Sequence, residues 1–216
     1  MPIAITKAIT TLEAVEQQFG VKRTEESTFF PEWRSSLPLL SEFEQTELAT
    51  LRQRYLYQRS KGELLEITAL LLLVSPLLAL AGFYDPPFTV RAEESVLLTL
   101  VDSEETLHGR LDVLVLWDQV WIVVVESKKT ALSLWSALPQ TLAYLHANPN
   151  PKRPSYGLMT NGDEFAFVKL KQSDLHGSSN GAPYRSQYGL SRPFALLPAP
   201  QDFESVLQIL KHLSKL

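Results

Sequence analysis

The sequence predicts an α/β protein with a mixed central sheet flanked by helices on both faces. Residues 111–117 and 120–125, which we expect to be central strands, are almost wholly apolar, as strands covered by helices on both faces are. Two predicted hairpins are separated by one helical crossover, which makes the sheet partly antiparallel and partly parallel. With 216 residues, the chain is long enough for one domain with a sizeable core.

The N-terminal segment predicts two helices rather than a separate domain. A short helix at residues 11–19 is followed by glycine, a frequent C-terminal cap. A longer helix starts at Ser41, which together with Glu44 matches the S-x-x-E capping box. We expect residues 1–60 to form an N-terminal helical extension packed on a core of residues 61–216, within a single structural domain overall.

A long apolar run follows, from Ile67 to Tyr84. Its 18 residues carry no charge, which reaches the length of a membrane span. Pro76 interrupts the run and no basic cluster flanks it, so we favour a helix in the buried centre of the domain over a span. Glu66 then lies at the N-terminal end of this helix. An acidic residue there is explained equally well by the helix dipole, which favours negative charge, and by a role in a functional site.

The rest of the chain alternates strands, turns and helices. Asn161-Gly162 is a turn signal between two of the strands. In chain order we expect a strand at 88–100, a hairpin at 111–125, a helix with Gln140 and Tyr144, strands at 155–160 and 164–170, a long loop with a short strand in it at 172–200 and an amphipathic helix at 202–216.

Composition limits the chemistry. The chain contains no cysteine, which excludes disulfides, a thiolate nucleophile and cysteine-bound zinc. The N-terminus lacks the long apolar segment of a signal peptide, so we expect a cytoplasmic protein. The formal net charge of −4 argues against a protein that coats nucleic acid. Acidic side chains are in excess in residues 61–120 and basic ones in residues 121–216, which permits a carboxylate cluster beside cations.

The hairpin at residues 111–125 carries charge where apolar residues would pack better. Asp112 lies in its first strand, Glu126 follows its second strand, and Lys128 comes two residues later. If Asp112 and Glu126 are directly opposed, both carboxylates and the lysine share one face of the sheet. A two-residue turn at residues 118–119 shifts the register by one and puts Glu126 on the other face. A shared site therefore requires a three-residue turn or a β-bulge.

Two carboxylates at this distance repel each other unless a cation lies between them. Oxygen ligands of this kind suit Mg²⁺, with Mn²⁺ as a substitute, and a neighbouring lysine can orient or deprotonate a water. A charged strand end that is merely solvated is the simpler alternative, and the E-x-K pattern alone is weak. The addition of Gln140 and Tyr144, one turn apart on the following helix, makes the combination more specific.

This combination resembles the PD-(D/E)XK nuclease superfamily, which has the restriction-endonuclease-like fold with an αβββαβ core. Residues 140–144 (QTLAY) match the Q-x-x-x-Y motif of its RecB-like and type I restriction branches. From residue 29 to its end, the chain also resembles small stand-alone bacterial proteins of the restriction endonuclease subunit R type. Leu111 departs from the family, which has proline before the aspartate, but this residue does not ligate metal.

The resemblance implies a metal-dependent endonuclease that hydrolyses phosphodiester bonds of nucleic acid, with DNA favoured over RNA. It implies Mg²⁺ as the cofactor, held by Asp112, Glu126 and the backbone carbonyl of Ser127. The alternative is a nuclease fold that has lost catalysis and serves as a nucleic-acid-binding or assembly module. The intact set of acidic residues, lysine and glutamine argues against that alternative, because buried charges are costly to keep.

The resemblance also assigns roles to neighbouring side chains. Lys128 is expected as the catalytic lysine, Glu66 as the acidic residue from the first core helix, and Gln140 as the residue that orients the substrate or the lysine. Weaker candidates for contacts with nucleic acid are Tyr144, Lys129, Lys152, Arg153 and Arg185. We expect nucleic acid as the partner and no membrane. Restriction-like folds often pair two sites in a homodimer, but no segment of this sequence specifies an interface.

Overall fold

A computed structural model describes residues 3–99, 106–117, 120–172 and 186–216. Within them, a nine-stranded sheet has the order β1-β4-β5-β6-β7-β8-β2, with β3 paired to β4 and β9 to β7. The strands are β1 (Ile3–Ala4), β2 (Val21–Arg23), β3 (Phe88–Thr99), β4 (Thr106–Trp117), β5 (Val120–Ser127), β6 (Ser155–Thr160), β7 (Glu164–Gln172), β8 (Ser186–Leu190) and β9 (Phe194–Ala195).

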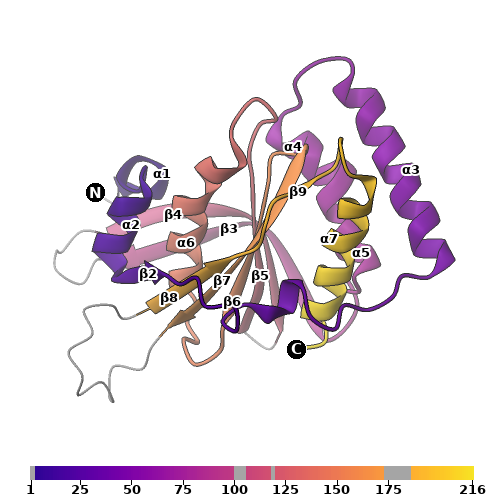
Figure 1. The fold of residues 1–216 in the computed structure, drawn as a ribbon. Helices are drawn as coiled ribbons and strands as arrows, with labels where there is room; N and C mark the ends of the chain where they lie inside the picture. The colour runs from indigo at the N-terminus through magenta and orange to yellow at the C-terminus, as the bar shows by residue number, and fades with distance from the viewer. Residues whose placement is uncertain (1–2, 100–105, 118–119, 173–185) are drawn as a thin grey trace.

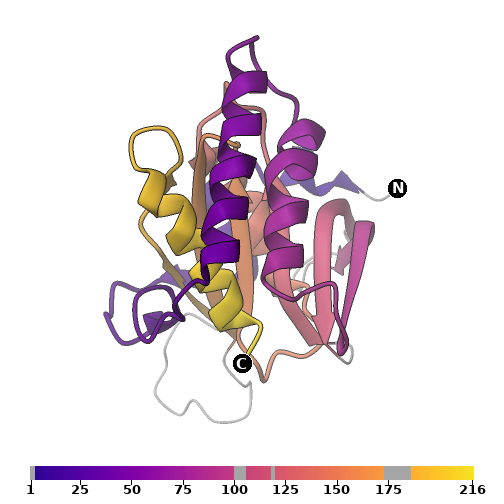
Figure 2. The same ribbon diagram turned by 90° about the vertical axis from the view of Figure 1, so that its right-hand side faces the viewer.

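Helices cover both faces of this sheet, as Figure 1 and Figure 2 show from two directions. One layer contains α1 (Ile5–Ala8), α2 (Leu12–Phe19) and α6 (Leu138–His146). The other contains α3 (Glu42–Arg59), α4 (Glu66–Ala69), α5 (Ser75–Leu80) and α7 (Pro200–Leu213), with a π-helical turn at Leu70–Val74 between α4 and α5. Short 3₁₀ turns occupy Pro31–Trp33 and Leu134–Ala137. The sheet contains parallel and antiparallel pairs, so the predicted mixed α/β architecture is confirmed.

Local signals set the ends of the N-terminal helices. Thr11 caps α2 by accepting a hydrogen bond from the backbone N–H of Ala14, and Gly20 ends it at a φ of +59°. Ser41 and Glu44 form both hydrogen bonds of the predicted capping box at the start of α3. Both helices therefore begin where the sequence predicts.

Two separate cores lie on the two faces of the sheet. The α6-side core joins α1, α2 and α6 to the sheet, with Val15, Leu142 and Tyr144 fully buried. The α7-side core joins α3, α5 and α7 to the other face, with Leu77 and Leu210 fully buried. Each such aliphatic side chain stabilises the fold by about 1.5–3 kcal/mol relative to exposure. This two-sided burial explains why the central strands are apolar along their whole length.

The first 60 residues contribute strands as well as helices. β1 pairs in parallel with β4, and β2 pairs in parallel with β8, so the N-terminal segment reaches two distant parts of the sheet. Neither strand is predicted by the sequence. Strands of two and three residues are too short to show the alternation of apolar and polar residues on which strand prediction depends.

The apolar run after Glu66 is helical, but the prediction that it is buried all round is wrong. Leu73 and Leu77 are fully buried, whereas Ile67 is 57% and Leu71 is 65% exposed. The helix covers the sheet with one face, and the opposite face meets solvent. Among the helices within the described residues, none is long and apolar enough to cross a membrane.

Candidate active site

Strands β4 and β5 meet the register requirement through a bulge. Their ladder shifts by one residue just before Leu116, which leaves one extra residue on β5. Beyond the bulge the last pair of the ladder is Val113 with Val125. Continued by one residue, this register sets Asp112 opposite Glu126. The backbone therefore has the bulge that the sequence analysis required for a shared site.

Asp112 lies at a fork in the sheet. On the edge that faces β5, β4 pairs with β5 as far as Val113, and further down it pairs with β1 at Leu107 and His108. β4 thus changes its neighbour from β5 to β1 along its length. Asp112 lies next to the end of the β4–β5 ladder.

The buried face of β4 also changes at Asp112. Leu111 packs in the α6-side core, whereas Val113 packs against the α7-side core. The register places Glu93 of β3 across from Asp112, and Glu93 has a φ of +54°, in the left-handed region that residues other than glycine rarely adopt. Such strained residues concentrate at functional sites. We infer that this kink sets the direction of the strand on either side of Asp112.

Substitutions at Glu93 and at its neighbour Glu94 are expected to have opposite preferences. At position 93, Gly should be tolerated and Val should lower the free energy of unfolding by about 1–2 kcal/mol, because a left-handed φ suits glycine best and strains β-branched residues most. At position 94, in regular strand, Val should be tolerated and Gly should cost about 1 kcal/mol. Urea unfolding of Glu93→Gly, Glu93→Val, Glu94→Gly and Glu94→Val measures this. The same order of stability at both positions would contradict the inferred kink.

A directed chain of hydrogen bonds ties the lysine to β4. The Nζ of Lys128 donates to Oε1 of Gln140 at 3.0 Å, Nε2 of Gln140 donates to the hydroxyl of Tyr144 at 2.8 Å, and that hydroxyl donates to the backbone carbonyl of Arg110 at 3.1 Å. Gln140 is 9% exposed and Tyr144 fully buried, so the chain runs through the protein interior. It fixes the direction of the lysine side chain relative to the strand that carries Asp112.

Gly109 makes this chain sterically feasible. A Cβ atom at this position would lie 2.7 Å from both the ring and the hydroxyl of Tyr144. The ring is buried, and its hydroxyl accepts one hydrogen bond and donates another, so the ring cannot move without breaking these contacts. Only glycine therefore allows α6 to approach β4 this closely.

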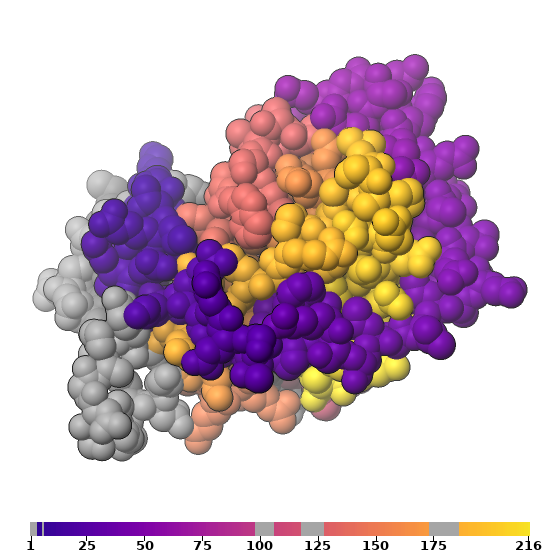
Figure 3. Space-filling model, in the orientation of Figure 1, coloured from indigo at the N-terminus to yellow at the C-terminus, as the bar shows by residue number. Residues whose placement is uncertain are grey.

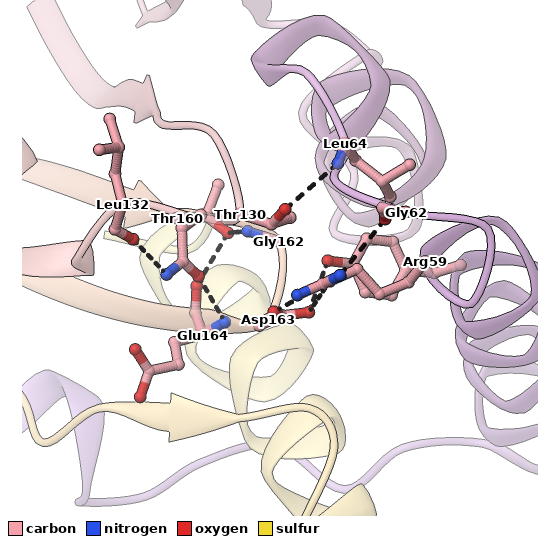
Figure 4. A network of polar contacts seen from close by, with 11 residues as sticks. Arg59, Gly62, Leu64, Thr130, Leu132, Thr160, Gly162, Asp163 and Glu164 are labelled. Carbon is pink, nitrogen blue, oxygen red and sulfur yellow. Dashed lines mark hydrogen bonds and ion pairs between the residues drawn. The ribbon is translucent and has the colours of Figure 1, made fainter.

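Thr130 connects the start of α4 to the end of β5 (Figure 4). Its hydroxyl accepts a hydrogen bond from the backbone N–H of Leu64 at 3.2 Å, and its own N–H donates to the carbonyl of Leu64 at 3.4 Å. Thr130 follows Lys128 by two residues, and Leu64 precedes Glu66 by two. The backbone N–H of Lys128 also donates to the carbonyl of Thr160 on β6 at 2.8 Å. These bonds hold the segments that carry Glu66 and Lys128 against each other.

The turn between β6 and β7 anchors the end of α3 (Figure 4). Asp163 accepts a hydrogen bond from the hydroxyl of Tyr55 at 2.9 Å and from Nε of Arg59 at 3.1 and 3.2 Å. Burial, followed by the bond to Asp163, raises the pKa of Tyr55, which keeps this donor protonated. Arg59 also donates to the carbonyl of Gly62, at the start of the segment that leads to α4. The turn is centred on Gly162-Asp163, one residue later than its sequence signal indicates.

Among the predicted site residues, the structure joins Lys128, Gln140 and Tyr144 by hydrogen bonds. Glu66 and Asp112 are half-buried, and Lys128 is half-buried and bound to Gln140. Tyr144 supports Gln140, but it is fully buried, so the prediction that it contacts nucleic acid is wrong. The backbones of Glu126 and Ser127 lie on β5, paired with β6, but their side chains lie outside the part that the structure describes.

Three other predicted residues do not join this group, and one lies outside the described residues. Lys129 is exposed beside the site. Lys152 and Arg153 are exposed in the loop after α6, with Arg153 5.8 Å from the ring centre of Trp117. Trp117 lies at the opposite end of the β4–β5 hairpin from Lys128, so the structure does not place these two residues at the site. Arg185 lies outside the described residues.

The predicted acidic residues fit a hard divalent cation in the chemistry of their donors. The carboxylates of Asp112 and Glu66 are oxygen ligands of the kind that Mg²⁺ and Mn²⁺ prefer. Among the side chains that the structure describes, no group of three histidine, cysteine, aspartate or glutamate residues gathers closely enough to hold a metal. Glu126, the third predicted carboxylate, directly follows Val125, the last β5 residue paired with β4, and its side chain is outside the described set.

Comparison with known proteins does not establish a family. No protein-family model and no curated protein matches the chain. Among solved structures, the chain is similar to a fragment of a putative HsdR subunit of a type I restriction enzyme from Vibrio vulnificus YJ016, with 20% sequence identity and a TM-score of 0.38. The similarity covers 49% of this chain and 21% of the other. We base no conclusion on a likeness of this extent.

Proposed function

We propose that the chain is a metal-dependent nuclease that hydrolyses phosphodiester bonds of nucleic acid, with DNA as the favoured substrate. The observation that carries this proposal is the hydrogen-bonded chain from Lys128 through Gln140 and Tyr144 to β4. It gives the E-x-K lysine a fixed direction beside the strand of Asp112, and it gives both members of the Q-x-x-x-Y pattern a physical task. We accordingly assign the fold to the restriction-endonuclease-like PD-(D/E)XK type.

In this proposal the acidic residues hold the cation and the lysine acts on the reacting groups. Asp112, Glu126 and the carbonyl of Ser127 ligate Mg²⁺, and Glu66 approaches from the start of α4. A bound cation would polarise the phosphodiester and lower the pKa of a ligated water. The ammonium group of Lys128, oriented by Gln140, directs the attacking water and offsets the negative charge that develops on the phosphate. Water adds across the P–O bond, which leaves one phosphate end and one hydroxyl end.

Incubation of the chain with single- and double-stranded DNA tests the proposal. We expect cleavage in millimolar Mg²⁺ or Mn²⁺ and none in EDTA, with RNA as a parallel substrate. Absence of cleavage with both metals on all substrates would reject a nuclease. Binding of DNA without cleavage would instead indicate the alternative, a fold that retains recognition and has lost catalysis.

Thr130 is expected to act as a positioning residue for this activity. Thr130→Val keeps the shape of the side chain but removes the hydroxyl that accepts from Leu64, so only the backbone bond from Thr130 to Leu64 still holds the start of α4 against β5. We expect cleavage to fall by roughly 10- to 100-fold, the range that a small misplacement of reacting groups produces. Thr130→Ser keeps the hydroxyl and should stay within about threefold of the original rate.

Single-turnover cleavage rates and thermal unfolding, measured on both Thr130 variants, separate positioning from stability. Loss of one hydrogen bond should lower the free energy of unfolding by only about 1 kcal/mol, so Thr130→Val should remain folded at the assay temperature. Equal rates for the valine and serine variants would contradict the positioning role and leave the nuclease proposal intact.

A further inference from the structure

A cavity of about 690 Å³ lies on the α6 side of the molecule, apart from the candidate active site. Its wall is formed by the start of α2, the 3₁₀ turn before α6, and the segment that follows β8. Figure 3 shows the face on which these three parts of the chain border one another. None of Glu66, Asp112, Lys128 and Gln140 lines this cavity. Its volume is that of a small-molecule site.

Two indole rings line the cavity. Trp135 lies on the 3₁₀ turn before α6 and is 40% exposed, although its size would favour burial. Trp33 is half-buried, and its ring meets that of Phe194 edge to face, with 6.3 Å between the ring centres. Flat aromatic rings of this kind bind planar ligands by stacking. The cavity therefore favours a ligand with an aromatic ring.

Two guanidinium groups accompany the indoles, and they differ in what they can do. Arg192 is held by two hydrogen bonds to Asp202, at 2.6 and 2.9 Å, and lies 4.2 Å from the ring centre of Phe194, so it forms a rigid wall with its charge offset. Arg23 pairs with Glu25 at 3.7 Å, with the two side chains 53% and 82% exposed. An exposed pair of this kind contributes little, so Arg23 can turn its donors toward an anion, and its planar fork suits phosphate.

We propose that this cavity binds a nucleotide, with the base stacked on Trp135 and the phosphate held by Arg23. An uncharged aromatic ligand would not use Arg23, and a simple anion would not use the two indoles. Proteins generally bind single-stranded nucleic acid by stacking its bases on aromatic side chains and placing cationic side chains beside its phosphates. The same chemistry serves a free mononucleotide and a nucleotide within a single strand. The proposal does not depend on the nuclease activity.

Calorimetric titration of the full chain with adenosine 5′-monophosphate tests the proposal. All titrations contain EDTA, which prevents hydrolysis, so the result is independent of the nuclease proposal. We expect saturable binding of the mononucleotide, and binding at least about tenfold weaker for adenosine and for inorganic phosphate, because each retains only one of the two interactions. Absence of saturable binding by the mononucleotide and by a single-stranded hexanucleotide would overturn the proposal.

Variants then place the ligand in the cavity. Trp135→Ala should weaken binding about tenfold, which is within the effect of removing one stacked ring. Trp117→Ala is the matched control, because Trp117 is 36% exposed and lies outside the cavity. Arg23→Gln should reduce the affinity for the mononucleotide to that for adenosine. Equal losses in the two tryptophan variants, or no loss in Arg23→Gln, would overturn the proposal.

The hexanucleotide distinguishes the two sources of the ligand. Tighter binding of the strand than of the mononucleotide, lost in Trp135→Ala, assigns the cavity to a nucleotide within a strand. Equal or weaker binding of the strand assigns it to a free mononucleotide. Both results support the proposed chemistry.

Discussion

Replacement of Lys128 by methionine is expected to reduce DNA cleavage by at least about 100-fold. Methionine keeps the length and the apolar stem of the side chain but removes the ammonium group that donates to Gln140 and acts on the reacting phosphate. Lys129→Met is the matched control, because Lys129 is exposed and its replacement removes the same charge from the same strand end. Initial rates on one DNA substrate, at one Mg²⁺ concentration, measure both variants.

Two outcomes would contradict the role of Lys128. A rate near that of the original chain would show that the ammonium group does not take part. Equal losses for Lys128→Met and Lys129→Met would show a general effect of positive charge on DNA binding. Because Oε1 of Gln140 would lose its donor, unfolding of each variant should be measured as well, and a cost of about 1–3 kcal/mol is expected for Lys128→Met.

Replacement of Asp112 by asparagine is expected to abolish metal-dependent cleavage. Asparagine has the same shape but lacks the charge, and the loss of one anionic ligand should reduce cleavage by at least about 100-fold. Asp85→Asn, in the exposed turn before β3, removes one negative charge at a distance from the site and is the matched control. Titration with Mn²⁺, followed by electron paramagnetic resonance, should show weaker binding for Asp112→Asn alone.

The Mn²⁺ titration separates loss of the metal from loss of the fold. Thermal unfolding of Asp112→Asn and of the original chain, both without metal, measures any change in stability separately from metal binding. Unchanged Mn²⁺ affinity in Asp112→Asn would contradict the assignment of this residue as a ligand, whatever the rate of cleavage.

The helices were predictable because their signals are local. Ser41 and Glu44 form a capping box within four residues, and Gly20 ends α2 at a positive φ. The order of elements from α4 to β6 was also predictable, because long apolar strands and an amphipathic helix differ in period. The edge strands β1 and β2 were not, since their pairing depends on β4 and β8 far along the chain.

The sequence predicts a condition that a shared site must meet, but not the backbone geometry that meets it. The spacing of Asp112, Glu126 and Lys128 shows that a shared face needs one extra residue in the hairpin, but it does not show where. The structure places that residue on β5, just beyond the pair that Leu116 forms. Likewise, the left-handed conformation of Glu93 could not be predicted, because glycine is the residue that normally signals such a conformation.

The residues that brace the site were missed because their partners are distant in sequence. Thr130 bonds to a residue 66 positions away, and Asp163 bonds to Tyr55 across 108 positions. The predicted hairpin begins only at residue 111, whereas the structure places Gly109 within β4, where glycine often marks close approach of another element. The structure identifies that element as α6, through the ring of Tyr144.

A crystal of the chain grown with Mn²⁺, and measured at the manganese absorption edge, tests the central claim most directly. We predict an anomalous peak about 2.1 Å from carboxylate oxygens of both Asp112 and Glu126, with the carbonyl of Ser127 as a further ligand and Nζ of Lys128 on the same face. Carboxylates of Asp112 and Glu126 on opposite faces of the sheet, or a peak confined to another part of the molecule, would contradict the claim.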